Sequence, residues 1–516
     1  MRSRSLLKRE LFSFCSRSES LSEDGLHDII EWFGLSPNNH HHVGNYEFFG
    51  RACLNERVTE GIIQCLLEYF PAAASAHRDG SSPLLLACQN PNMTLNIVQL
   101  LIDAAPDSVR SVNNKSRMPL HRLCGKQILD EVATLEILKL LIEKYPGAVR
   151  HATTSNGDFL PIHIASGWRA SEFCQVLIEE YPGSERMTDE AGMLPIHYAC
   201  MDNTVATVQY LYKLHPDSIN HTDTDGKYPI HLAIMGVYQR DNPRATVDIV
   251  KFLLDCDPNV KLQKLYEHSL LEFACRWEYT DSTIAAALEM IKVIYDAYPE
   301  AIEDDAIASH IHDFHEHVQT FIASQLVYAH QAKDYRQMTT SDSSGQLPLH
   351  RALQNNVTLG SIKLLVKGNP AAVQTPDNSG TFPMHVACQH HESPSVIKYL
   401  VGLDATTLDA VDQEGNTALH LACHCARHEI IALLLDEFDA VSVSKRNTQK
   451  KLPIDLLWES NAVEVEDKES NEYVESAFRL LKAYPETLIN IGIQKPLSAF
   501  NAFPGQSGRK RKFGEE

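Results

Sequence analysis

The sequence predicts an all-α solenoid in which short helix-turn-helix units stack one after another. Three observations predict it: a heptapeptide recurs at nearly constant spacing, a turn motif precedes most copies, and an amphipathic segment follows them. A fixed period of about 20 to 50 residues is the sequence signature of a repeat architecture. The length of 516 residues also exceeds what one compact core supports.

The heptapeptide combines proline, histidine and cysteine or another small residue. The clearest copies are MPLHRLC (118–124), LPIHIAS (160–166), LPIHYAC (194–200), YPIHLAI (228–234), LPLHRAL (347–353), FPMHVAC (382–388) and TALHLAC (417–423). Weaker copies are EFFGRAC (47–53), SPLLLAC (82–88), SLLEFAC (269–275) and LPIDLLW (452–458). The second residues of these copies are 35, 36, 42, 34, 34, 41, 78, 35, 35 and 35 residues apart. The gap of 78 is twice 39, so it fits one degenerate repeat or a helical insertion.

Each unit is expected to contain a tight turn, a short helix, a loop and a longer helix. Turn sequences such as DEAG (189–192) and DQEG (412–415) place Asp and Gly before the heptapeptide. Asp bonds its own backbone in such turns, and Gly tolerates a positive φ. Proline suits the first turn of a helix, where its missing N–H removes no bond. The following segments, such as NIVQLLIDAAPDSV (96–109), carry apolar residues at helical spacing.

These heptapeptides resemble the T-P-L-H-x-A core of ankyrin repeats, whose period is about 33 residues. The resemblance covers roughly residues 46 to 485. It implies a stack of repeats whose concave face, made of turn tips and short helices, binds a partner protein. The family's Thr occurs only at Thr417, so elsewhere the helix N-terminus is expected to be capped by another group or by water.

The repeat spacing divides the chain into five expected regions. These are an N-terminal tail and pre-repeat segment (1–45), a first repeat arm (46–303), a helical insertion or degenerate repeat (304–340), a second repeat arm (341–490) and a disordered basic tail (491–516). The segment 307–337 is expected to form one continuous helix. The Arg- and Ser-rich first 20 residues are expected to be disordered, with an organelle transit peptide as the alternative.

Histidine and cysteine each occupy one fixed position of the repeat. A catalytic pair is needed once, whereas a packing requirement recurs in every unit. We therefore expect the histidines to bond backbone groups of adjoining loops and the cysteines to pack as small buried side chains. The histidines are His121, His163, His197, His231, His350, His385 and His420, and the cysteines are Cys53, Cys88, Cys124, Cys200, Cys275, Cys388 and Cys423. No disulfide is expected among these cysteines.

Composition and missing motifs exclude several classes of function. The formal net charge of −21 disfavours direct nucleic-acid binding by the repeat body. No run of about 18 apolar residues occurs, so membrane insertion is not expected. Reduced thiols in the cytoplasm and/or nucleus are expected from the 12 cysteines. The phosphate-loop, nucleophile-elbow, HExxH and kinase motifs are absent, so we expect no enzyme activity, catalytic residue, cofactor or small-molecule substrate.

Two histidine-rich stretches are candidate metal sites. NNHHHVGN (38–45) is expected to be a solvated loop. LHLACHCARH (419–428) contains His420 and Cys423, which already belong to the repeat packing. No metal site is therefore expected at either stretch.

The best candidates for partner binding lie where the repeat pattern is broken. Trp168 and Arg169 follow one short helix, and Arg276, Trp277 and Tyr279 follow another. Trp, Tyr and Arg are the residue types that dominate binding hot spots. The alternative is that these aromatic residues fill gaps beside long loops.

The sequence favours a non-enzymatic scaffold or adaptor that binds a partner protein of unknown identity. The alternative is a nuclear regulatory cofactor, because the C-terminal stretch contains four consecutive basic residues that are typical of a nuclear import signal. These residues are Arg509, Lys510, Arg511 and Lys512.

Overall fold

The computed structural model consists of helices joined by turns and loops in its described part, which includes an isolated β-bridge between Leu265 and His268. It describes residues 4–17, 21–37, 46–76, 80–125, 130–154, 157–238, 240, 242–303, 305–391, 393–438, 441–460 and 471–485. The chain divides into two compact units, Met1–Phe321 and Ile322–Glu516. Each unit is described by itself.

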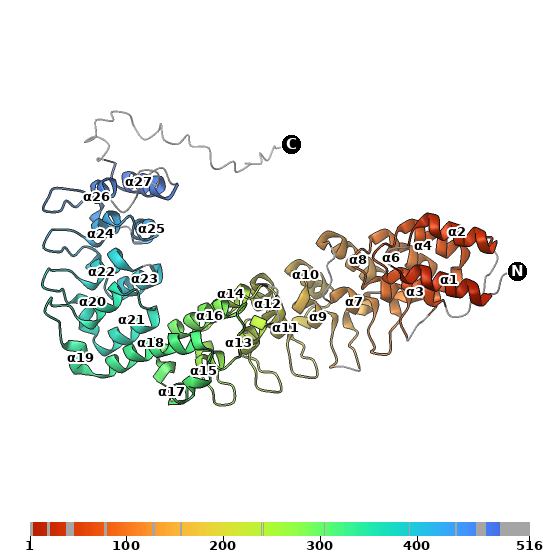
Figure 1. Cartoon of the computed structure of the whole chain (residues 1–516), viewed down its shortest axis with the longest axis horizontal. Helices are drawn as coiled ribbons and strands as arrows, with labels where there is room; N and C mark the ends of the chain where they lie inside the picture. The colour runs from red at the N-terminus through yellow and green to blue at the C-terminus, as the bar shows by residue number, and fades with distance from the viewer. Residues whose placement is uncertain are drawn as a thin grey trace. The chain divides into compact units, whose positions relative to one another are not determined.

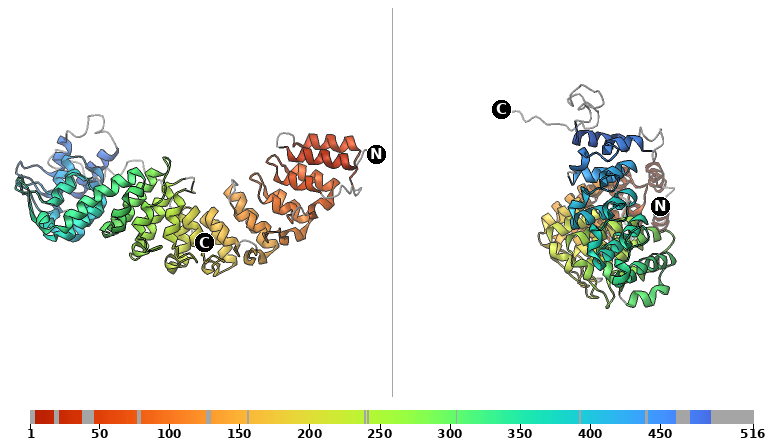
Figure 2. Two further views of the ribbon diagram at one scale, coloured as in Figure 1. Left: turned by 60° about the horizontal axis from the view of Figure 1, so that its bottom comes forward. Right: turned by 90° about the vertical axis from the view of Figure 1, so that its left-hand side faces the viewer.

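In the first unit, short and longer helices alternate along the chain and stack in two rows (Figures 1 and 2). The helices are α1 (Arg4–Ser16), α2 (Glu23–Phe33), α3 (Glu47–Leu54), α4 (Glu60–Tyr69), α5 (Pro83–Ala87), α6 (Leu95–Ala104), α7 (Pro119–Cys124), α8 (Glu131–Lys144), α9 (Pro161–Trp168), α10 (Ser171–Glu180), α11 (Pro195–Asp202), α12 (Val205–Leu214), α13 (Pro229–Met235), α14 (Arg244–Cys256), α15 (Leu270–Cys275), α16 (Ile284–Ala297) and α17 (Asp305–His310). Short 3-10 turns lie at Pro71–Ser75, Pro106–Arg110, Pro146–Arg150, Ser184–Arg186, Pro216–Asn220, Gly236–Tyr238, Val260–Leu262, Pro299–Glu303 and Ile311–Asp313.

The second unit repeats the same alternation. Helix α18 (Glu316–Lys333) crosses the boundary between the units, and it is followed by α19 (Tyr335–Thr339), α20 (Pro348–Gln354), α21 (Leu359–Gly368), α22 (Pro383–His390), α23 (Pro394–Leu403), α24 (Ala418–His424), α25 (His428–Asp436), α26 (Pro453–Glu459) and α27 (Asn471–Ala483). The 3-10 turns are Pro370–Gln374, Ala405–Leu408 and Val441–Ser444. One continuous apolar core runs from Met338 to Leu480. The all-α solenoid predicted from the repeat is thereby confirmed.

Proline begins the short helices, as predicted. Helices α5, α7, α9, α11, α13, α20, α22 and α26 each start at the proline of the heptapeptide. The preceding turns use glycine at positive φ, for example +79° at Gly345. A Cβ atom there would lie 2.7 Å from the backbone nitrogen of Asn378 in the next turn, so the close approach of successive turns requires glycine.

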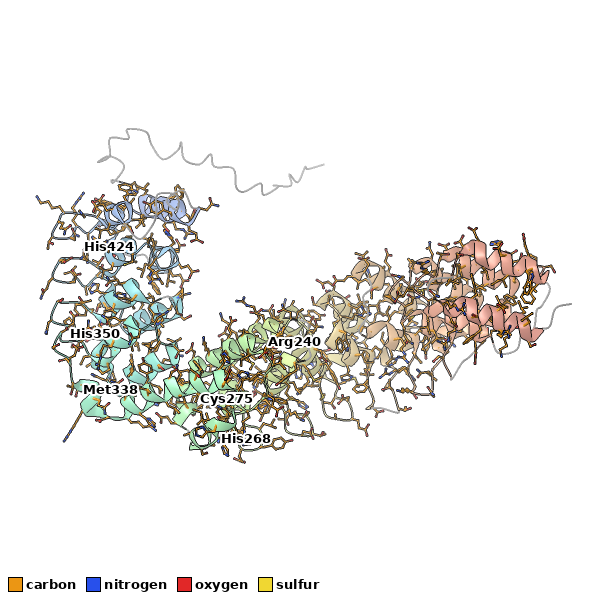
Figure 3. All side chains as sticks on the ribbon, in the orientation of Figure 1. Arg240, His268, Cys275, Met338, His350 and His424 are labelled. Atoms are coloured by element: carbon orange, nitrogen blue, oxygen red, sulfur yellow. The ribbon has the colours of Figure 1, made fainter. Side chains whose placement is uncertain are left out.

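The periodic histidine replaces the missing threonine cap. In the repeat that begins with α11, the backbone N–H of Leu194 donates to Nδ1 of His197 over 3.0 Å. Because Nδ1 accepts, Nε2 carries the hydrogen and donates to the carbonyl of His221 in the next repeat, at 3.2 Å. The same pair of bonds forms at His121, His163, His350 (Figure 3), His385 and His420. The predicted bonding of histidine to adjoining loops is confirmed.

His231 forms only half of this arrangement. Its Nδ1 accepts from the N–H of Tyr228 at 3.1 Å, but its buried Nε2 has no hydrogen-bond partner among the described residues. The ring instead meets the ring of Phe273 edge-on, with 5.1 Å between the centroids. The loop that follows α14 places no carbonyl where the other repeats supply one.

Burial lowers the pKa of these histidines, since the charged imidazolium is penalised away from water. The pKa values of His121, His197 and His231 fall from 6.5 to about 4. These histidines are therefore neutral at physiological pH, as acceptance of a hydrogen bond at Nδ1 requires.

The periodic cysteines are buried, as predicted. All 12 cysteines are free thiols, and burial raises the pKa of Cys200 to about 12. A thiol with so high a pKa stays protonated and unreactive at physiological pH. The cysteine position of the repeat therefore serves packing.

Side chains that lie shortly after several of the short helices donate to carbonyl groups at the end of the short helix in the preceding repeat. Asn90 donates to the carbonyl of Cys53 at 2.9 Å, and Asn203 donates to that of Ser166 at 2.8 Å. Nε of Arg240, labelled in Figure 3, donates to the carbonyl of Met201 at 3.2 Å. These bonds satisfy carbonyl groups that a helix C-terminus leaves without an intrahelical partner.

The expectation of a disordered N-terminal tail was wrong for residues 4–16. They form α1, in which Leu7, Leu11 and Cys15 lie four residues apart on one buried face. Asn55 donates to the carbonyl of Cys15 at 3.1 Å, which is the capping bond seen between successive repeats. The apolar stripe thus outweighs the basic, serine-rich composition, and α1 occupies the place of a short repeat helix before α3.

The expectation of one continuous helix over 307–337 was also wrong. This segment consists of α17, a 3-10 turn, α18 and α19. The helix is interrupted after the 3-10 turn, where the side chain of Phe314 is buried in the core, and it is interrupted again at Asp334. The Asp334 carboxylate accepts from the N–H groups of Arg336 and Gln337 at 3.0 and 3.4 Å, which starts a new helix.

Candidate functional site

A pocket with a volume of about 500 Å³ lies on the row of short helices in the first unit. It is formed by α7, α9 and α11 together with the turns before α7 and α9. The lining residues are Gln89, Arg117, His121, Arg122, Gly125, Phe159, Ile164, Trp168, Tyr198, Met201 and Asp202. Because Gln89 follows α5, four successive repeats contribute to one hollow.

The aromatic wall of the pocket is held rigidly. Phe159 and Tyr198 meet edge-on with 5.9 Å between ring centroids, and Tyr198 also contacts the ring of His163 at 6.0 Å. The hydroxyl of Tyr198 donates to the carboxylate of Asp189 in the turn before α11. Burial and this carboxylate raise the pKa of Tyr198, so its hydroxyl stays protonated.

Two arginine residues add positive charge to the lining of the pocket. Arg117 lies in the turn before α7 and Arg122 lies on α7, and both side chains are half-buried. Burial lowers the pKa of Arg122, and the positive charge of Arg117 lowers it further. The two guanidinium groups are thus close enough to repel each other. Nε of Arg117 is buried and has no hydrogen-bond partner within the described residues.

Trp168, one of the predicted partner-binding residues, lines this pocket. It is the last residue of α9, and 39% of its surface is exposed. The adjacent Arg169 is only 8% exposed, and its Nε donates to the carbonyl of Leu123 at 3.0 Å. Its guanidinium lies over the ring of Phe173 at 5.5 Å. Trp168 is therefore available to a partner, whereas the Arg169 side chain caps α7.

The other three predicted residues lie in a separate aromatic cluster after α15. Trp277 is half-buried between the rings of Phe273 and Tyr238, at 5.8 and 6.0 Å. Tyr279 is 6% exposed and donates to the carbonyl of Ala274. Arg276 is exposed, and it bonds the carboxylate of Glu272 at 3.2 Å. Trp277 does not line the pocket that contains Trp168, so the predicted residues form two groups, and Tyr279 belongs to the packing.

The family model for ankyrin repeats, in three copies, matches residues 162–264, 307–409 and 349–447. The chain is an ankyrin repeat protein. Among solved structures, it is similar to the crystal structure of the human ASB11 ankyrin repeat domain, with 14% sequence identity and a TM-score of 0.33. That alignment covers 48% of this chain and 97% of the other. No curated protein matches the sequence.

Ankyrin repeats are generally modules for protein-protein interaction, and the pocket lies on the short helices and turns that such modules present. Sequence reasoning found only Trp168 among the lining residues of the ankyrin repeat pocket. Arg122 occupies the fifth heptapeptide position, which also holds Ile164 and Tyr198 in the next two repeats. All three line the pocket, so comparison of this variable position between repeats is the signal that points to the site.

The metal-site and import-signal candidates of this ankyrin repeat chain receive no further support from its described part. No group of three or more His, Cys, Asp or Glu side chains within the described ranges is arranged to hold a metal ion. His40, His41 and His42 lie outside those ranges, as do Arg509, Lys510, Arg511 and Lys512. None of the described helices is long and apolar enough to cross a membrane.

Proposed function

We propose that this ankyrin repeat protein is a non-enzymatic scaffold or adaptor that binds a partner protein through its short helices and turns. The pocket formed by α7, α9 and α11 is the principal contact in the first unit. The observation that carries the proposal is the exposed Trp168 at the edge of a hollow that also contains arginine and fixed aromatic rings. Central tryptophan and arginine residues in concave sites provide most of the free energy in many interfaces.

The rigidity of the pocket supports this function. Each lining helix is tied to the next repeat through its histidine, as His121 is to the carbonyl of His151 and His163 is to that of Met187. The hydroxyl of Tyr198 is held by Asp189. A surface that is ordered before binding loses little conformational entropy when the partner arrives. A hot-spot residue here should therefore act through contact rather than through folding.

Affinity capture with Trp168→Ala tests the proposal. The full chain and the variant are used to capture proteins from a native lysate, and Trp458→Ala serves as the matched control. Trp458 is 36% exposed, lies on α26 in the second unit and does not line the pocket. We expect the captured partner to be lost with Trp168→Ala and kept with Trp458→Ala, while circular dichroism shows equal helix content.

Trp277→Ala measures whether the second aromatic cluster contributes to binding. Retention of the full set of captured proteins by Trp168→Ala would contradict the assignment of the pocket. Loss of helix content in that variant would instead show that Trp168 acts in packing.

A further inference from the structure

We propose that residues 487–503 fold back along α27 and cover an exposed apolar stripe on that helix. The stripe consists of Val474, Ala477, Phe478 and Leu481, which recur at i, i+3, i+4 and i+7 and so share one face. The inference concerns the second unit and is independent of the pocket on α7, α9 and α11. It replaces the expectation that the whole C-terminal tail is disordered.

Helix α27 is the last described helix of the second unit, and its stripe is only partly covered (Figure 1). Val474 is 53% exposed, Phe478 is 39% exposed and Leu481 is half-buried. On α21, against which α23 packs, Val366 lies at the same distance before the proline of the following turn as Leu481 does, and it is buried. The ends of a repeat array require a polar outer face. The stripe on α27 instead has the apolar character of a surface that another segment covers.

Phe478 departs from the pattern of the longer helices. It lies seven residues before Pro485, which is the second residue after the end of α27. In every earlier described helix with a proline at that place, the residue seven positions before the proline is Lys or Gln. These residues are Gln64, Gln99, Lys139, Gln175, Gln209, Lys251, Lys292 and Lys363. Lys and Gln suit contact with water, whereas a phenyl ring is stabilised when it leaves water. Phe478 therefore indicates a neighbour on α27 that the other longer helices do not have.

The C-terminal part of the chain supplies a matching apolar segment. Residues 487–503 read TLINIGIQKPLSAFNAF and contain no acidic residue. Pro496 is suited to begin a helix, and Leu497, Phe500 and Phe503 follow at i, i+3 and i+6, which places them on one side of such a helix. The segment therefore offers an apolar side to the apolar stripe of α27.

The chain leaves α27 beside the stripe. Pro485 is the last described residue and lies four positions after Leu481. The stripe runs from Leu481 back to Val474, a length of about 10 Å at 1.5 Å per residue, and the 11 residues from Pro485 to Pro496 can span about 35 Å. The segment that precedes α27, NAVEVEDKES (461–470), carries four acidic residues and matches an apolar stripe less well. Composition and reach thus both favour residues 487–503 as the cover.

Photo-crosslinking from position 478 of the full chain tests the inference. The photoreactive residue p-benzoylphenylalanine is placed there, and mass spectrometry identifies the peptide that it captures on irradiation. We expect capture of residues 487–503 of the same molecule, with a yield that does not depend on protein concentration. The same photoreactive residue at position 209 is the matched control, because Gln209 is exposed and holds the equivalent place on α12. It should not capture this segment.

Hydrogen exchange of the full chain provides a second measurement. The variant Leu497→Asp/Phe500→Asp should speed amide exchange over residues 471–485 roughly tenfold or more, because burial of one large apolar side chain shifts an opening equilibrium by at least that factor. The control Phe513→Asp changes an aromatic residue beyond the segment and should leave this exchange as it is. Circular dichroism checks that each variant keeps its helix content.

Several outcomes would overturn the inference. Capture between two chains would assign the stripe to a second copy of this protein, and capture of residues 461–470 would assign it to that segment. Capture of no segment at all, or unchanged exchange in the Leu497→Asp/Phe500→Asp variant, would show that residues 487–503 do not cover α27. The proposed function is tested separately, by partner capture with Trp168→Ala, and it stands or falls without regard to these results.

Discussion

The inter-repeat histidine bond makes a quantitative prediction through the variants His197→Ala and His231→Ala. His197 holds the N–H of Leu194 and the carbonyl of His221, whereas His231 holds only the N–H of Tyr228. Both rings are fully buried. Removal of either ring leaves a similar cavity and one buried N–H without its acceptor. Only His197→Ala also leaves a carbonyl without its donor.

An unsatisfied buried polar group costs about 1–3 kcal/mol. We therefore expect His197→Ala to lower the free energy of unfolding by about 1–3 kcal/mol more than His231→Ala does. Each ring also loses one edge-on contact, His197 with His221 at 5.9 Å and His231 with Phe273 at 5.1 Å, so these contacts largely cancel in the difference.

Urea unfolding of the full chain at pH 7.5, followed by circular dichroism, measures the difference. Hydrogen exchange over residues 188–203 and 222–236 locates the loss in the intended repeat, which matters because repeat arrays need not unfold in one step. Equal destabilisation by the two variants, or a larger effect of His231→Ala, would refute the assigned role of the Nε2 bond.

Three further predictions follow from the same contacts. Burial lowers the pKa of His121, His197 and His231 from 6.5 to about 4, so the unfolded chain binds protons first as the pH falls. The contribution of these histidines to the free energy of unfolding is therefore complete above pH 6.5 and should decline down to about pH 4, by up to about 3 kcal/mol for each histidine. Thermal unfolding at several pH values measures this decline. Leu11→Asp should destabilise the first unit by about 3 kcal/mol or more, because it places an unpaired charge on the buried face of α1, whereas the same change at exposed Ser5 should have little effect in urea unfolding. Deletion of residues 509–512 from a fluorescent fusion should reduce nuclear accumulation if the basic run is an import signal, and an unchanged distribution would remove the support for the nuclear alternative.

Much of the fold could be predicted because the repeat is encoded locally. Proline fixes φ where each short helix begins, and the turn glycine tolerates a positive φ, so both leave a signal within a few residues. The role of histidine followed from its recurrence. Its replacement of the threonine cap was not foreseen, because Nδ1 reaches back to the N–H three residues earlier only in the folded turn.

The predictions for the N-terminal tail and for the long helix were wrong because they relied on composition and on segment length. The Arg- and Ser-rich N-terminus obscured an apolar stripe at Leu7, Leu11 and Cys15, which binds α1 to the array. The predicted long helix ignored Asp334, whose carboxylate favours a helix start.

The pocket could be predicted only in part, because its charges and rings come from different repeats. Arg122 and Trp168 are 46 positions apart in the sequence, and stacking alone brings them to one hollow. The sequence alone could not show that Trp168 is exposed while the adjacent Arg169 is buried.

The histidine bonds between repeats also have a direction, which bears on synthesis of the chain. Each of the six histidines that form this bond donates to a carbonyl that lies 24 to 31 residues later in the sequence. A chain that grows from its N-terminus therefore presents each short helix before the group that secures it exists. The inter-repeat bonds should therefore form one repeat behind the growing end of the chain. A ribosome that stalls between two repeats leaves Nε2 of the last histidine without its carbonyl acceptor.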